Sequence, residues 1–222
     1  MQAEDARATG SRLGADVEVL FAENNAILQI QQLFRFVHAA DEDRPVAIVV
    51  ETVTGEGLER VARNAVKAGI GWVLLNRSVD YLAELRQQRS DLPISMVTVD
   101  QQEIGRIQAR QFRALLPRGG SLLYVQGPPD TSAARERLAG MEEGIQGAGI
   151  ERRVLNGDWT EESGHKAVES WLRLKTSEGF RPDVVGAQND AMAVGARAAL
   201  QAAHPDWTGM SFTGFDGLPE GG

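Results

Sequence analysis

The sequence predicts an α/β protein built on parallel sheets. Along its 222 residues, short apolar runs that fit strands alternate with longer stretches that fit amphipathic helices. Strands separated by helices of this length are typical of right-handed βαβ units, which form parallel sheets. Gly and Pro mark the joints between elements, as at Arg44-Pro45 and at Pro117-Arg-Gly-Gly120.

The expected elements follow one another regularly from the first third of the chain to its end. Helices are predicted where apolar residues recur at steps of three and four, over 27–37, 58–68 and 104–115, and again after Asp190. Gly69 is expected to end the second of these helices. The apolar runs predict strands at 17–21, 46–50, 72–75, 94–99, 121–126, 153–155, 184–187 and 211–215.

Composition narrows the function before any motif is considered. With 42% hydrophobic residues the chain can bury a real core, and no apolar run approaches the ~20 residues that span a bilayer. The net charge is −8, from 31 acidic and 23 basic residues, and no basic block stands out, which argues against duplex nucleic acid as the main partner. The absence of cysteine excludes disulfides and thiolate metal sites.

Polar side chains follow the predicted strands. The run 184–187 ends in Gln188-Asn189-Asp190, and six of the other seven predicted strands also end in polar residues, at 51–52, 76–77, 100, 126, 156–159 and 216. Helix caps and turns explain many such residues, and Asp190 is expected to serve as a cap. The carboxyl edge of an open parallel sheet is also where ligands bind, so these residues are candidates for one site.

The residue types at this edge suit a polyhydroxylated ligand. Carboxylates, carboxamides and the forked guanidinium form paired hydrogen bonds with vicinal hydroxyls. Trp159 could stack on the C–H face of a sugar ring, and a packing role is an equally good interpretation of it. Trp72 and Trp171 lie in apolar patterns and are expected in the core.

At this point the chain resembles a known family, the type I periplasmic sugar-binding proteins of the ribose- and galactose-binding group, which is related to the effector domains of LacI-type repressors. The resemblance covers nearly the whole chain. It rests on Asn76-Arg77, Val99-Asp100, Thr131-Ser-Ala-Ala-Arg-Glu-Arg137, Gln188-Asn-Asp-Ala-Met-Ala193 and Gly214-Phe-Asp-Gly-Leu-Pro-Glu220. It implies two Rossmann-like lobes, here 1–101 and 102–222, which close by hinge motion over a monosaccharide in the cleft between them.

The resemblance also implies ligand-binding roles for seven residues. Arg77 and Arg137 would grip sugar hydroxyls, and Trp159 would supply the aromatic contact. The remaining positions would add polar contacts: Glu51, Asn76, Asn189 and Asp216. Two of them depart from the family pattern, since Asn76 stands where an acidic partner is usual and Glu51 where the ribose binders use Asn, so the identity of the sugar is left open.

The resemblance further implies that both ends of the family fold are missing. The family's first strand has no counterpart before residue 17, and the chain stops where the family continues with further elements of both lobes. We therefore expect reduced stability and weak or absent sugar affinity, unless a partner chain, such as a second copy in a homodimer, or a rearranged strand pairing fills the gap.

Catalysis is not expected. His38, His165 and His204 lie far apart in sequence, and neither a zinc-protease motif nor a nucleophile elbow is present. No cofactor and no metal site is predicted. The expected function is that of a periplasmic solute receptor, with a sugar ligand and the membrane permease of an ABC importer as partners. The alternatives are the effector domain of a cytoplasmic LacI-type regulator and the sensor domain of a membrane receptor.

Overall fold

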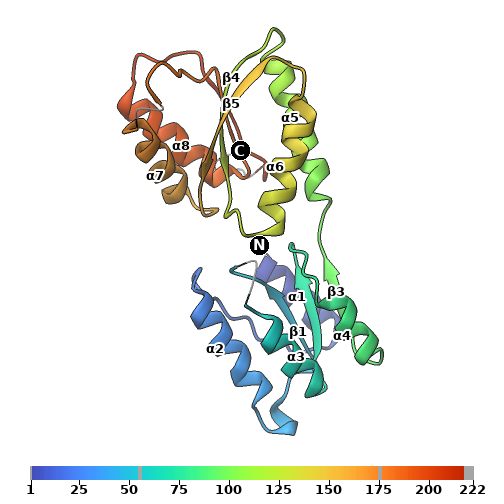
Figure 1. The fold of residues 1–222 in the computed structure, drawn as a ribbon. Coiled ribbons are helices and arrows are strands. Elements are labelled where there is room, and N and C mark those ends of the chain that lie inside the picture. Colours follow the sequence, from blue (N-terminus) through green and yellow to red (C-terminus); the bar gives the residue numbers. More distant parts are fainter. Residues whose placement is uncertain (1, 55–56, 175–176, 218–222) are drawn as a thin grey trace. The chain divides into compact units, whose positions relative to one another are not determined.

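The computed structural model describes residues 2–54, 57–174 and 177–217, and its chain forms two compact units (Figure 1). Unit 1 comprises Met1–Leu75 and Asp80–Met96, and unit 2 comprises Asn76–Val79 and Val97–Gly222. Both units alternate helices with strands, which confirms the predicted α/β class. The lobe boundary at residue 101 stays a prediction. In the described ranges, no helix has the length and apolar character needed to span a bilayer.

Unit 1 contains a three-stranded sheet in the order β1-β2-β3. Strands β1 and β2 are parallel, with Ala47 opposite Gly71, and the fully buried Trp72 on β2 is a core residue, as predicted. The elements are α1 (Gln2–Leu13), α2 (Ala26–Val37), a 3-10 turn (Asp41–Asp43), β1 (Ala47–Glu51), α3 (Glu59–Lys67), β2 (Gly71–Leu75), α4 (Leu82–Gln88) and β3 (Ile94–Val97).

The prediction of a strand at 17–21 is wrong. This segment lies between α1 and α2 without strand pairing, and Phe21 at its end is 60% exposed. Its alternating apolar pattern satisfies the local preference for an extended chain, but a strand also needs a hydrogen-bonded neighbour. Among the described strands, β1 pairs only with β2 and forms the edge of its sheet, where Val49 is 61% exposed.

Unit 2 contains a four-stranded parallel sheet in the order β5-β4-β6-β7. Each strand is followed by a helix or lies beside one, as βαβ connections require. The elements are α5 (Gln101–Leu115), β4 (Gly120–Gln126), α6 (Ser132–Ile145), β5 (Ile150–Asn156), α7 (Glu161–Leu172), β6 (Val184–Ala187), α8 (Asp190–Ala203) and β7 (Ser211–Thr213).

Helices cover both faces of this sheet: α5 and α6 lie on one side, and α7 and α8 on the other (Figure 1). The alternation of side chains along β4 matches this arrangement. Leu122 and Tyr124 pack with Phe112 of α5, whereas Leu123 and Val125 pack with the core that contains Trp171. The expectation that Trp171 is a core residue is confirmed.

Glycines bring the helices of each layer into close contact. A Cβ atom on Gly105 of α5 would lie 2.1 Å from the carbonyl oxygen of Arg137, and one on Gly140 of α6 would lie 1.9 Å from that of Gln102. On the other face, Gly164 and Gly195 allow the same close approach of α7 and α8. The backbones of the paired helices are thus in direct contact. This contact fixes which residues of α6 lie opposite which residues of α5.

Substitution of Gly140 by Ala tests this constraint. The added methyl group would collide with the carbonyl oxygen of Gln102, so the two helices must separate, and we expect a loss of about 1–3 kcal/mol in the free energy of unfolding. Urea denaturation followed by circular dichroism measures it. Ala139→Ser, at an exposed position of the same helix, is the matched control, with an expected change within about 0.5 kcal/mol. Equal stability of the two variants would contradict the close contact.

Candidate functional site

The carboxyl ends of β4 and β6 are joined by a fully buried side chain, that of Gln188. Its Oε1 accepts a hydrogen bond from Gly127 N at 3.0 Å, and its Nε2 donates to the carbonyl oxygen of Ala134 at 2.9 Å. One amide group therefore satisfies backbone atoms of the turn after β4 and of α6. Because buried polar groups are costly when unpaired, this arrangement holds the strand ends and the first turn of α6 together.

Arg137 lies beside this junction on α6. Its Nε donates to Gln101 Oε1 at 2.8 Å, and its Nη1 donates to the carbonyl oxygen of Gln188. The guanidinium carbon lies 4.7 Å from the ring centre of Phe215 and 5.6 Å from that of Trp159. Burial lowers the pKa of Arg137, and the nearby Tyr124 and Asp216 act in the opposite direction. Both of these acceptors are uncharged, so neutral hydrogen-bond acceptors and two aromatic rings surround a partly desolvated cation.

Trp159 adopts a left-handed backbone conformation, with φ of 60°, which is unusual for a large side chain. Neighbouring groups hold it in place. Ser163 Oγ accepts from Asp158 N and from Thr160 N, and Asn189 Nδ2 donates to the carbonyl oxygen of Trp159 at 2.8 Å. The indole lies against Gly127, where a Cβ atom would come within 2.2 Å of it. Residues with an unfavourable backbone conformation that several contacts hold in place are common in ligand-binding sites.

Asn189 and Asp190 both have structural roles at the start of α8. The cap of α8 is Asn189, whose Oδ1 accepts from Met192 N at 3.0 Å, and the expectation that Asp190 is the cap is wrong. Asp190 is buried, and its Oδ1 accepts from Phe215 N at 2.7 Å. Position 190 is already inside the helix, so its carboxylate projects toward β7 instead of back to the helix end. A ligand contact by Asn189 stays a prediction.

Asp216 follows Phe215 at the end of the same segment. Its side chain is exposed at the surface, but the partial burial of the carboxyl group raises its pKa. A hydrogen bond with the Asp190 backbone lowers this pKa, the charge of the Asp190 carboxylate raises it, and the charge of Arg137 lowers it. The structure thus brings together the side chains of Arg137, Trp159 and Phe215 and the charge of Asp216. The predicted motif that contains Asp216 extends past residue 217, outside the described residues.

The segment 76–79 belongs to unit 2 by its contacts. Asn76 N donates to the carbonyl oxygen of Val97 at 2.9 Å, and Ser78 N donates to Ser132 Oγ at the start of α6 at 2.8 Å. Asn76 has φ of 61°, a conformation that Asn tolerates better than most residues, and Arg77 is buried. Six of the seven predicted site residues therefore belong to unit 2.

The seventh, Glu51, belongs to unit 1. It ends β1, and its side chain is exposed. Gln29 of α2 closes the strand end around it: Gln29 Nε2 donates to the carbonyl oxygen of Glu51 at 2.8 Å, and Gln29 Oε1 accepts from Val53 N at 3.0 Å. The buried Gln29 thus plays in unit 1 the part that Gln188 plays in unit 2.

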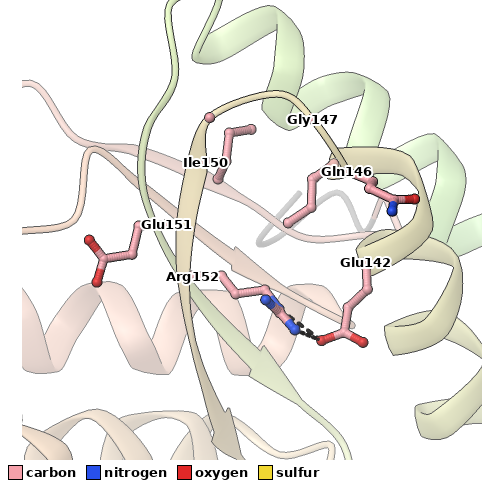
Figure 2. A pocket seen from close by; sticks show the side chains of 8 residues that line it. Glu142, Gln146, Gly147, Ile150, Glu151 and Arg152 are labelled. Atoms are coloured by element: carbon pink, nitrogen blue, oxygen red, sulfur yellow. Dashed lines mark hydrogen bonds and ion pairs between the residues drawn. The ribbon is translucent and has the colours of Figure 1, made fainter.

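Unit 2 has two surface hollows whose linings do not include Arg137. One, of about 410 Å³, is found where α6 ends and β5 begins, and Figure 2 shows the Arg152 side chain directed at Glu142, with which it forms an ion pair. None of the predicted site residues lines it. The other, of about 480 Å³, lies between α5 and the end of β7, and its lining includes Asp190 and Phe215.

Three residues contact Arg137, and two of them, Gln101 and Phe215, were given no role from sequence, whereas Gln188 was a candidate through its place at a strand end. Gln188 stands in the polar run after a strand, which was a usable signal for the strand edge. Gln101 follows the helix cap Asp100 and looks like an ordinary first-turn residue. Its contact joins positions 36 residues apart, and only the packing of α5 on α6 brings them together.

Comparisons of the sequence and of the structure with known proteins both find periplasmic or sugar-binding proteins. The model of the periplasmic binding protein domain matches residues 2–221. A putative rhizopine-binding protein of Rhizobium meliloti is 28% identical over 207 residues, which are 91% of this chain and 63% of that protein. The ribose import binding protein RbsB of Escherichia coli is 26% identical over 220 residues, 98% of this chain and 68% of that protein.

Among solved structures, a galactofuranose binding protein superposes with a TM-score of 0.75 and 26% identity. The match covers 89% of this chain and 64% of that one. The chain therefore spans roughly two thirds of the length of these relatives, between 63% and 68%.

Asn189 offers a test of how the Trp159 loop is held. Asn189→Ala removes both the cap of α8 and the donor to the Trp159 carbonyl oxygen, and we expect a loss of about 0.5–2 kcal/mol in the free energy of unfolding. Asn189→Ser keeps a capping oxygen but loses the amide N–H that donates to the Trp159 carbonyl oxygen, so it should recover most of this stability. Both variants should alter the near-ultraviolet circular dichroism of Trp159. An unchanged spectrum in both would show that the tether does not hold the indole.

Proposed function

Because the chain belongs to the periplasmic binding protein domain family, we propose that it binds a small sugar at the carboxyl ends of the strands of unit 2. The observation that carries the proposal is the Arg137 guanidinium, which is partly desolvated, oriented by two acceptors and flanked by two aromatic rings. The names of the relatives point to the same class of ligand, since one is a ribose import protein and one a galactofuranose binding protein.

The chemistry of Arg137 suits sugar hydroxyls. A guanidinium carries five N–H donors, and two of them are used within the described residues, so three are available in one plane. Hydroxyl oxygens on adjacent carbons can accept from such a fork. A low-dielectric environment strengthens these bonds, and the two acceptors keep the fork oriented before the ligand arrives.

The remaining predicted residues complete the proposal. Trp159 supplies an apolar ring surface, and Asp216 supplies a carboxylate that accepts from hydroxyls. Arg77, Asn76 and Asn189 add polar contacts from segments that converge on the first turns of α5, α6 and α8. A ligand contact by Glu51 stays a prediction.

At the level of the cell, we propose the role of a solute receptor. The sugar would be delivered to the membrane permease of an ABC importer, and the protein would act in the periplasm. The effector domain of a LacI-type regulator is the second candidate. It would use the same ligand site. The two candidate functions would therefore differ in the protein's partner and not in its sugar ligand.

Titration with monosaccharides tests the ligand site. Isothermal calorimetry or ligand-observed NMR with a panel of pentoses and hexoses should reveal weak but saturable binding, with a dissociation constant of about 1 mM, for at least one sugar. Arg137→Ala should weaken that binding at least tenfold, roughly the effect of losing one charged hydrogen bond.

Arg152→Ala is the matched control for this titration. It removes the same charge from an exposed ion pair at the start of β5, away from the proposed site, and should leave the affinity unchanged. Absence of binding for the whole panel would overturn the proposal, and so would equal weakening by the two substitutions.

The pH dependence of binding tests the role of Asp216. Since burial raises the pKa of this carboxyl, its proton returns at a higher pH than that of an ordinary aspartate. The carboxylate accepts hydroxyl hydrogen bonds only when ionised, so affinity should be full above the raised pKa and should fall as the pH is lowered through it. Asp216→Asn should bind more weakly at pH 7 and lose this dependence. A wild-type affinity that is constant between pH 4 and pH 7 would contradict the role.

A further inference from the structure

We propose that Gln101 is a positioning residue, which fixes the orientation of the Arg137 guanidinium and joins it to Asn76 and to the segment that leads into α5. The contact itself is seen directly, and its meaning for ligand binding rests on the sugar site proposed above. The proposal includes no contact between Gln101 and the ligand. Gln101 would affect binding only by orienting Arg137.

Gln101 uses both ends of its side-chain amide. Its Oε1 accepts from Arg137 Nε at 2.8 Å, and its Nε2 donates to Thr98 Oγ1 at 3.3 Å and to the carbonyl oxygen of Asn76 at 3.4 Å. The side chain is 3% exposed, so water cannot readily replace these partners. A single planar group therefore links α6, the residues before α5 and Asn76, at the start of the loop that carries Arg77.

The amide suits this place better than a charged or apolar side chain does. It offers an acceptor to the cation on one side and donors to two oxygens on the other. A carboxylate would keep the bond to Arg137 but would face the carbonyl oxygen of Asn76 without a proton to share. A thioether of the same length would provide neither group, and Arg137 Nε would then be left without its acceptor.

The contact of α5 with α6 sets the distance between Gln101 and Arg137. Because Gly105 and Gly140 allow the backbones to touch, Gln101 on the first turn of α5 stands level with Arg137. The second acceptor of Arg137, the carbonyl oxygen of Gln188, lies at the end of β6. The guanidinium is thus fixed from two independent elements, and removal of Gln101 leaves only one.

The adjacent Gln102 provides the comparison. It is the same residue type on the same helical turn, but it is exposed, and its amide donates to Glu143 at 3.3 Å. Substitution of Gln102 changes the helix propensity of the same turn as substitution of Gln101 does, but it removes no contact with Arg137.

The experiment follows the Arg137 Nε–H signal by ¹H–¹⁵N NMR of the whole chain, assigned by its disappearance in Arg137→Lys. We expect a signal protected from exchange with water in the wild type and in Gln101→Glu, and its loss or shift to the position of exposed arginines in Gln101→Met. Gln102→Met should leave it unchanged. Thermal unfolding of each variant confirms that it is folded. A protected, unshifted signal in Gln101→Met overturns the proposal.

Sugar affinity gives the second readout. With the sugar that binds the wild type best, Gln101→Met should weaken binding about tenfold, whereas Gln101→Glu should stay within about threefold, because it retains the acceptor for Arg137. Equal affinity of Gln101→Met and wild type would overturn the ligand role of Gln101. If the wild type binds no sugar, the proposed function fails and the ligand role with it, while the NMR signal still decides whether Gln101 orients Arg137.

Discussion

The pairing of buried polar groups at the carboxyl end of the second sheet is the constraint on which unit 2 depends. Strands that stop inside a protein leave backbone groups that must find partners. Gln188 meets this need for the turn after β4 and for α6, and its own carbonyl oxygen accepts from Arg137. The same bonds that complete the sheet end therefore orient the cation proposed to bind ligand, so stability and function share their residues.

Strain and close packing converge on the same place. Trp159 and Asn76 both have positive φ, and both are candidate ligand residues. Trp159 is held by the cap of α7 and by Asn189, the cap of α8, so two helix starts position one ring. A rigid arrangement of this kind lowers the entropy that binding must overcome. The glycines between α5 and α6 contribute because the close helix contact places Arg137 beside Gln101.

Much of the fold could be predicted because it depends on local patterns. Strand and helix periodicities placed seven strands and the main helices close to their observed positions, and Trp72 and Trp171 were correctly expected in the core. The failure at 17–21 has a physical cause, since an extended pattern becomes a strand only beside a partner. The candidate site was predicted as a set of strand ends. That Arg137 meets Gln101 and Phe215 could not be predicted, because these contacts join distant positions.

The sequence by itself determined the α/β class, the order of elements and the family, since apolar periodicity and short motifs act over a few neighbouring residues. Only the tertiary structure decided which of the polar residues after the strands form structural hydrogen bonds. It made Asn189 the cap of α8, turned Asp190 toward Phe215, and placed Arg137 between two rings with neutral acceptors. The physical reason is that a polar side chain takes its role from the partners that packing brings to it, and those partners come from other elements.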